Sequence, residues 1–178
     1  MVLAYAELLF GTIFLLSGTA FLCFPDRSLK ILRVGIRSPT ANWICFAPAL
    51  IWFLWYITQL GEADFGKYKD FFFTFFAMVG LIALLHVRDF LVVRGACILT
   101  LLTAHELLEA AYMENDIARL WMVSGIYLSI VIAIYWGALP YRLRDFLDWF
   151  QNKRGFFYTR LLGILLASYG YKVLATIP

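Results

Sequence analysis

Six apolar segments, each close to the length needed to cross a bilayer, take up most of this 178-residue chain. A transmembrane helix needs about 17–25 predominantly apolar residues to span a hydrocarbon core of about 30 Å. The segments cover residues 3–24, 41–60, 71–87, 92–113, 120–139 and 157–177, and short charged connections separate them. We therefore predict one transmembrane domain over residues 1–178, an all-α polytopic membrane bundle of six helices arranged as three hairpins.

Composition supports this fold class and argues against others. The chain is 63% hydrophobic and 15% charged, whereas soluble domains contain about 45–50% apolar and 25% charged residues. A cleavable secretory signal begins with basic residues, but the first segment carries Glu7 and no basic residue, so we expect it to be retained. The formal net charge of +3 is confined to short membrane-flanking loops, so membrane topology rather than nucleic-acid binding explains it.

Lysine and arginine are sorted between alternate connections. One set of connections holds Arg27, Lys30, Arg33, Arg37, Arg88, Arg94, Arg142, Arg144, Lys153, Arg154 and Arg160. The opposite set holds Lys67, Lys69 and Arg119, with Lys172 nearby. Because short basic loops stay on the cytoplasmic side, we expect both termini outside and the hairpin tips in the cytoplasm. The membrane would be a bacterial inner membrane or its organellar equivalent.

Two of the basic connections have the pattern of helices that lie in the headgroup region. "FPDRSLKILRVGIR" and "LPYRLRDFLDWFQNKR" each follow an apolar segment, and in the second the residues Leu143, Phe146, Leu147 and Phe150 recur at i, i+3, i+4 and i+7. We predict interfacial helices after the first and fifth spans. The side chains expected to contact anionic lipid or a cytoplasmic partner are Arg27, Lys30, Arg33, Arg37, Arg142, Arg144, Lys153 and Arg154.

The stretch "LLTAHELLEAAY" places His105, Glu106 and Glu109 on one face of an otherwise apolar helix. An ionisable side chain at membrane depth costs about 2.5–3.5 kcal/mol, so each needs a partner or a cavity. Glu7 shares a helical stripe with two glycines, which predicts that it faces a neighbouring helix. We expect Glu7 to meet Glu106 or Glu109, where two carboxylates would share a proton.

Two interpretations of these polar residues stay open. They form either a proton or cation site, with His105 as relay, or a buried polar joint between helices. "HELLE" also resembles the first half of the zinc-protease pattern H-E-x-x-H, which makes His105 and Glu109 weak metal-ligand candidates. The other histidine, His86, lies at the far end of the preceding segment, so one ion could not easily bind both. We predict no cofactor.

Small residues recur every fourth position in the fifth segment, at Gly125, Ser129, Ala133 and Gly137. Such a ladder lets a second helix approach closely. Gly163 and Ala167 form a matching shorter ladder in the sixth segment, so we expect these two helices to pack together. The alternative is docking to another subunit.

The sequence lacks a recognisable nucleophile elbow or phosphate-binding loop. We therefore interpret the chain as a small non-catalytic accessory or scaffold subunit of a larger membrane assembly, whose partners are the lipid bilayer and other membrane subunits or a second copy. The competing hypothesis is a small transporter or channel that uses Glu7, Glu106 and Glu109. A third is an intramembrane metal-dependent enzyme centred on "HELLE".

Overall fold

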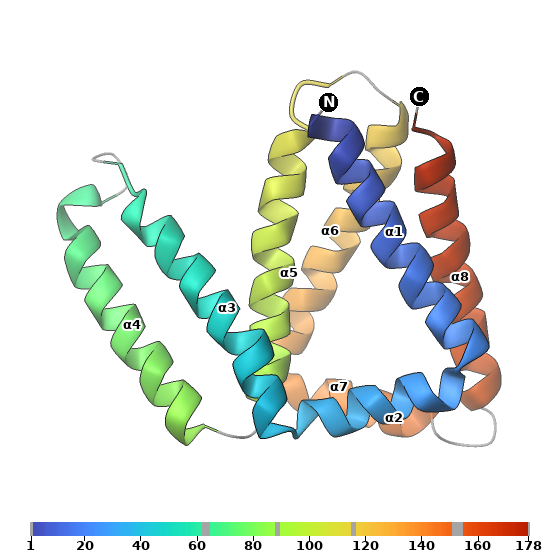
Figure 1. Cartoon of the computed structure of the whole chain (residues 1–178), viewed down its shortest axis with the longest axis horizontal. Coiled ribbons are helices and arrows are strands. Elements are labelled where there is room, and N and C mark those ends of the chain that lie inside the picture. The colour runs from blue at the N-terminus through green and yellow to red at the C-terminus, as the bar shows by residue number, and fades with distance from the viewer. Residues whose placement is uncertain (1, 62–64, 88–89, 115–116, 151–154, 178) are drawn as a thin grey trace.

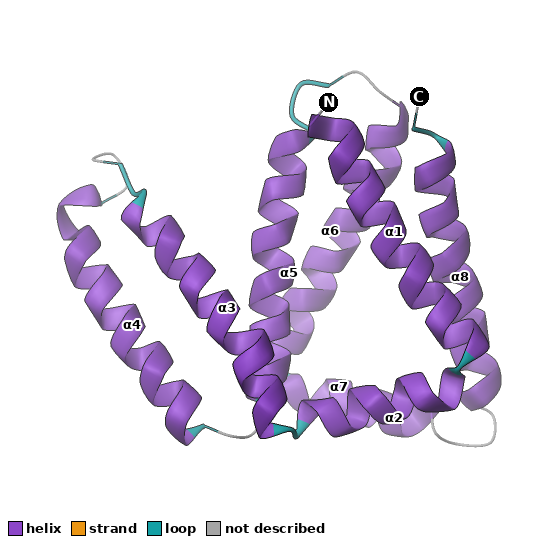
Figure 2. Ribbon diagram, viewed as in Figure 1, coloured by secondary structure: helices purple, strands orange, loops and turns teal. Residues whose placement is uncertain are grey.

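The computed structural model describes residues 2–61, 65–87, 90–114, 117–150 and 155–177, and all regular elements in these ranges are helices (Figures 1 and 2). The elements are α1 (Val2–Cys23), α2 (Pro25–Ile36), α3 (Pro39–Thr58), the short 3-10 helix η2 (Gly66–Tyr68), α4 (Lys69–His86), α5 (Leu91–Ala110), α6 (Ile117–Ala138), α7 (Pro140–Phe150) and α8 (Gly155–Ala175). Each predicted apolar segment forms one long helix. The two predicted amphipathic stretches form α2 and α7.

Five of these helices, α1, α3, α4, α5 and α6, are long and apolar enough to cross a membrane. The predicted all-helical, multi-pass membrane architecture is confirmed to that extent. The helix α8 has 21 residues but falls outside this group; it carries Arg160 and Lys172 near its two ends. The sixth span therefore stays a prediction.

Prolines determine where the chain turns between long and short helices. Pro25, Pro39 and Pro140 are the first residues of α2, α3 and α7. A proline at the first helical position loses no helical hydrogen bond, whereas it cannot continue a preceding helix without breaking one. Ser38 completes the turn before α3, because its side chain accepts a hydrogen bond from the backbone nitrogen of Ala41 at 3.4 Å.

The long helices run between two distinct ends of the molecule (Figure 1). The helices α2 and α7 cross the others steeply at one end, which we call the basal end. Both chain termini lie at the opposite end, which we call the terminal end. The helices α1, α5, α6 and α8 form the main bundle, and the α3–α4 hairpin diverges from it toward the terminal end (Figure 1).

Each end of the bundle has its own apolar core. The terminal core joins α1, α5, α6 and α8 and comprises Leu3, Ala6, Phe10, Ala104, Leu107, Ala111, Met122, Ile126 and Val173. The basal core joins α2, α5, α6 and α7 and comprises Leu29, Ile36, Val93, Cys97, Ala133, Leu147 and Phe150. The amphipathic helices thus cover the basal end of the bundle with their apolar faces.

The closest helix approach is between α1 and α8, where glycines bring the two backbones into contact. A Cβ atom added at Gly170 would lie 2.5 Å from the backbone nitrogen of Leu15, and one at Gly163 would lie 2.8 Å from that of Leu22. A Cβ atom at Gly18 would overlap the backbone nitrogen of Ala167. Small residues permit such approaches between membrane helices.

This contact corrects the predicted pairing of the two small-residue ladders. The ladder at Gly163 and Ala167 packs against α1 rather than against the ladder of α6.

On α6, Gly125 lies beneath the side chains of Phe10 and Tyr169, and Gly137 lies beside Cys97. Ala133 belongs to the basal core, and the hydroxyl of Ser129 donates to the carbonyl oxygen of Gly125 at 2.8 Å. The α6 ladder therefore serves contacts with three different helices.

Candidate functional site

The basal end carries a concentration of charged residues on the exposed faces of α2 and α7. In α2, Leu29 and Ile36 are buried, whereas the basic side chains between and beside them are exposed. In α7, Leu147 and Phe150 are buried in the same core. An amphipathic helix turns its polar face away from the core it covers, and Arg33 of α2 and Arg144 of α7 both line a groove between the two helices. We call this groove the basal seam.

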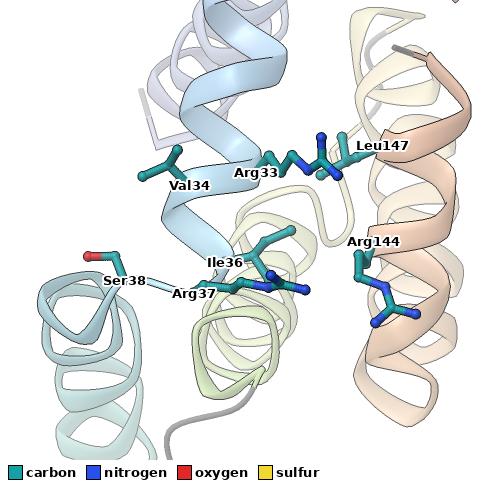
Figure 3. Close-up of a pocket in the computed structure, with 7 residues that line it drawn as sticks. All are labelled: Arg33, Val34, Ile36, Arg37, Ser38, Arg144 and Leu147. Atoms are coloured by element: carbon teal, nitrogen blue, oxygen red, sulfur yellow. The ribbon is translucent and has the colours of Figure 1, made fainter. Parts of the chain in front are cut away.

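Three arginines line a cavity of about 520 Å³ in the basal seam. Its walls are Arg33, Val34, Ile36, Arg37, Ser38, Arg144 and Leu147. The side chains of Arg33 in α2 and of Arg37, which follows α2 directly, extend toward α7, which carries Arg144 (Figure 3). Guanidinium groups present planar pairs of donors that match phosphate or carboxylate oxygens. The chemistry of this cavity therefore suits an anionic group.

Carboxylates neutralise part of this positive charge. Arg33 Nη2 lies 2.9 Å from Asp148 Oδ1, which joins α2 to α7. Arg144 Nη2 lies 3.0 Å from Oδ1 of its neighbour Asp145. Both pairs are about half exposed, so each stabilises the fold by at most about 1 kcal/mol. Among the described residues no carboxylate pairs with Arg37, whose charge is available to an external anion.

A second cavity, of about 530 Å³, adjoins the first and shares Arg33 and Val34 with it. It is also lined by Asp26, Leu29, Lys30, Phe150 and Phe156. Two other predicted contact residues lie on the same helices: the guanidinium of Arg27 sits 5.9 Å from the ring centre of Phe24, and a side-chain hydrogen bond with Tyr141 raises the pKa of Arg142. The remaining two, Lys153 and Arg154, lie outside the described residues.

The "HELLE" side chains lie at the terminal end of α5, on the side that faces α3. His105 Nε2 is 3.9 Å from Glu109 Oε2, and both side chains are more than half exposed. The hydroxyl of Tyr56 on α3 donates a hydrogen bond to Glu106 Oε1, and its ring packs edge-on against His105 with 5.4 Å between ring centres. Sequence reasoning did not find Tyr56, because it lies 50 residues from Glu106 in the chain.

Glu7 occupies a different environment from these exposed carboxylates. Its side chain is 1% exposed. It lies on the same face of α1 as Leu3 and Phe10, which pack against Ala104 and Leu107 of α5 in the terminal core. The prediction that Glu7 faces a neighbouring helix agrees with this burial. The expected sharing of a proton with Glu106 or Glu109 stays a prediction: those two side chains are exposed, whereas Glu7 is buried.

Within the described residues, no three histidine, cysteine, aspartate or glutamate side chains come together as a metal site would require. His105 and Glu109 are brought together, but a third such ligand is not. Lys172 is accounted for by an aromatic contact, because its Nζ atom lies 3.5 Å from the ring centre of Trp121.

Comparison with known proteins gave no match: no family model, curated protein or solved structure resembles this chain significantly.

Proposed function

We propose that this chain is a small non-catalytic membrane protein, an accessory or scaffold subunit of a larger membrane assembly, that holds anionic phospholipid headgroups in its basal seam. The observation that carries the lipid part is the cavity lined by Arg33, Arg37 and Arg144. Basic pockets beside membrane helices recognise phosphate headgroups, and each basic residue near an anionic surface contributes about 1 kcal/mol.

The proposed position of the seam at the membrane surface follows from the helices around it. Five long apolar helices span between the two ends of the molecule. The helix α8 contacts α1 through two pairs of glycines, Gly11 with Gly170 and Gly18 with Gly163, which lie two turns apart. If α1 crosses the bilayer, α8 must cross beside it. Six crossings would return both termini to one side and leave α2 and α7 at the opposite surface.

Tags at the two termini test this topology. With six spans, a tag at the amino terminus and one at the carboxyl terminus are accessible from the same membrane side. In a chain whose own Cys23, Cys45 and Cys97 are replaced by serine, a cysteine introduced in place of Ser38 at the basal end reacts with membrane-impermeant maleimide from the other side. Termini on opposite sides would contradict the sixth span. Labelling of Ser38→Cys from the side of the termini would show that the basal seam does not lie at the opposite surface.

Headgroup binding is testable with purified protein in detergent. We expect phosphatidylglycerol to bind more tightly than phosphatidylcholine with the same acyl chains, as measured by native mass spectrometry. Replacing Arg37 and Arg144 together by glutamine should weaken phosphatidylglycerol binding by roughly 30-fold, as two contributions of about 1 kcal/mol predict. Phosphatidylcholine binding should stay unchanged.

A matched control removes the same charge from the other end of the molecule. Lys67 and Lys69 are exposed and precede or begin α4 at the terminal end. The double variant Lys67→Gln/Lys69→Gln should leave phosphatidylglycerol binding as it is. An equal loss in both double variants would mean that net charge, rather than the basal seam, attracts the lipid, and the lipid part of the proposal would be wrong.

The assembly part of the proposal is supported by the helix α4. Only 11% of the apolar stretch that would cross the membrane is buried within the chain. Its exposed surface includes Phe71 and Phe75, whose rings stack with 6.2 Å between centres. A helix that packs so little within its own chain has most of its surface available to another membrane subunit.

Purification from the native membrane in a mild detergent tests whether such a subunit exists. We expect a species larger than the chain itself, and loss of the partner in the variant Phe71→Ala/Phe75→Ala. The control Leu161→Ala/Leu165→Ala changes an exposed pair with the same spacing on α8 and should retain the partner. A single species with the mass of the monomer would contradict the assembly role.

A further inference from the structure

An apolar cavity, separate from the two basal cavities, lies between α3, α4 and α5, about halfway along the diverging hairpin. It has a volume of about 450 Å³ and is lined by Phe46, Ala49, Leu50, Phe53, Phe76, Val79, Gly80, Ile98, Leu101 and Leu102. All of these residues are apolar. We call this space the hairpin cavity. An apolar chain is the only kind of ligand group that its walls can accept without leaving polar atoms unsatisfied.

Polar side chains continue the two main walls of the hairpin cavity toward the terminal end. On α5, His105 and Glu106 follow Leu101 and Leu102 by four residues, which places them one turn further along the same faces. On α3, Tyr56 follows Phe53 by three residues. The hydrogen bond from Tyr56 to Glu106 shows that these extended walls still face each other beyond the cavity. We call Tyr56, His105, Glu106 and Glu109 the polar cap.

The depths of the polar cap and of the hairpin cavity match those of the headgroup and of the acyl chains of a lipid molecule. Tyr56 and Glu106 lie within one or two turns of the ends of α3 and α5, at Thr58 and Ala110. The cavity-lining residues Leu102 and Ile98 lie four and eight residues deeper than Glu106, or about 6 and 12 Å. If these helices span the bilayer, the polar cap lies near the headgroup level and the hairpin cavity at the level of acyl chains.

The charge of the polar cap selects among headgroups. It carries two carboxylates, Glu106 and Glu109, and its histidine lies beside one of them at 3.9 Å. A cation is the complementary partner, and a primary ammonium can donate charge-assisted hydrogen bonds to carboxylates, whereas a quaternary ammonium has no hydrogen to donate. Tyr56 holds Glu106 at the mouth of the cavity and so fixes one acceptor before the ligand arrives.

We infer that the hairpin cavity and the polar cap together bind one phospholipid with a primary ammonium headgroup, whose acyl chain fills the cavity and whose ammonium lies on Glu106 and Glu109. This site differs from the basal seam in position and charge, and it does not depend on the proposed anionic lipid binding.

The headgroup half of the inference is tested by lipid titration of the purified full-length chain, read by native mass spectrometry. Phosphatidylethanolamine should bind roughly tenfold more tightly than phosphatidylcholine with identical acyl chains, the difference expected for charge-assisted hydrogen bonds. The variant Glu106→Gln should abolish this preference. Glu114→Gln removes an exposed carboxylate beyond the end of α5 and should retain it. Equal binding of both lipids to the unchanged protein would overturn the inference.

Glu106→Gln also alters a contact between α3 and α5, so a second variant keeps the test independent of folding. Glu109 has a side chain that is 73% exposed, and Glu109→Gln should fold normally while lowering the preference for phosphatidylethanolamine. If both variants fold and both keep the full preference, the carboxylates do not recognise the ammonium and the proposed site is wrong.

The acyl-chain half is tested by filling the hairpin cavity. Leu101→Trp should reduce retention of phosphatidylethanolamine several-fold, because the larger side chain occupies the space proposed for the chain. Leu165→Trp places the same residue on an exposed site of α8 and should leave retention unchanged. Unchanged retention in Leu101→Trp would show that the lipid chain lies elsewhere and would overturn the inference.

Discussion

The α1–α8 pair and the α3–α4 hairpin are both antiparallel pairs of long helices, but they are held together in different ways. In the first pair, backbone meets backbone at Gly18, Gly163 and Gly170. In the second, the closest glycine, Gly80, meets only the side chain of Leu50, and an apolar cavity remains beside it. Backbone contacts cannot adjust without moving a helix, whereas side chains can change rotamer.

From this difference we expect the two halves of the molecule to have separate roles. The tightly packed α1–α8 pair supports the amphipathic helices, because α2 follows α1 directly and α7 precedes α8. The loosely packed hairpin instead leaves space for a ligand and exposes most of α4. Binding surfaces that must adapt are drawn from the less stable parts of a structure.

Among the substitutions that test this comparison, we expect the largest loss of stability at Gly18. In Gly18→Ala the new Cβ atom overlaps the backbone of Ala167, so α1 and α8 must separate. Overpacking costs about 1–3 kcal/mol, and we expect about 2–3 kcal/mol here because the opposing atoms are backbone. Unfolding of the purified protein, followed by loss of helical circular dichroism with increasing denaturant, measures this change in the free energy of unfolding.

Gly35 provides the control for this substitution. It lies in α2 with open space around its Cα atom. Alanine is a better helix former than glycine by about 1 kcal/mol, so Gly35→Ala should leave stability unchanged or raise it. Equal destabilisation by both substitutions would mean that the α1–α8 contact is not the tightly packed part of the molecule.

An intermediate effect is expected at Gly95, where α5 meets α3. A Cβ atom there would lie 2.8 Å from the Cα atom of Phe46, so backbone again opposes it. The hairpin can move away as a unit, and we therefore expect Gly95→Ala to cost about 1–2 kcal/mol, in the lower part of the overpacking range. Spin labels at Gln59 and Tyr112, at the terminal ends of α3 and α5, should report a longer distance.

If that distance stays unchanged while stability falls, the strain is absorbed inside the helices. The hairpin would then be packed as rigidly as the α1–α8 pair, and the distinction between the two halves would fail.

Local signals in the sequence predicted most of the fold. The prolines at positions 25 and 140 and the apolar spacing of Leu143, Leu147 and Phe150 mark short amphipathic helices, and both helices are present. These signals are reliable because each depends on backbone chemistry or on periodicity within a single helix. Helix boundaries agree within about three residues for the same reason.

Partners between helices could not be predicted in the same way. The stripe that contains Glu7 and Gly18 correctly indicated a face in contact with another helix, but nothing local indicates that Gly18 faces α8. For the same reason the ladders of α6 and α8 were paired with each other, although Gly163 packs on α1. Spacing identifies a face suited to close approach, whereas the choice of neighbour depends on the whole bundle.

The candidate sites also divide into features that the local sequence predicted and features that depend on several helices. The basal arginines were identified because the sorting of charge between loops is visible in the sequence. The hairpin cavity was not, because its walls come from three helices and each wall is an ordinary apolar face. The polar residues of "HELLE" were noticed, but their partner Tyr56 carries no signal that separates it from the other tyrosines.

Among these glycine substitutions, we expect the smallest loss of stability at Gly80. This substitution tests the comparison between the α1–α8 pair and the α3–α4 hairpin most directly. A Cβ atom there would lie 2.5 Å from the Leu50 side chain, whose branched end can rotate aside. We expect Gly80→Ala to lower the free energy of unfolding by less than about 1 kcal/mol, because the gain in helix propensity offsets much of the strain. Leu50 and Gly80 both line the hairpin cavity, so the same substitution should reduce its volume and weaken phosphatidylethanolamine retention. A cost equal to that of Gly18→Ala would contradict the comparison, because the hairpin would then be no more adaptable than the α1–α8 pair.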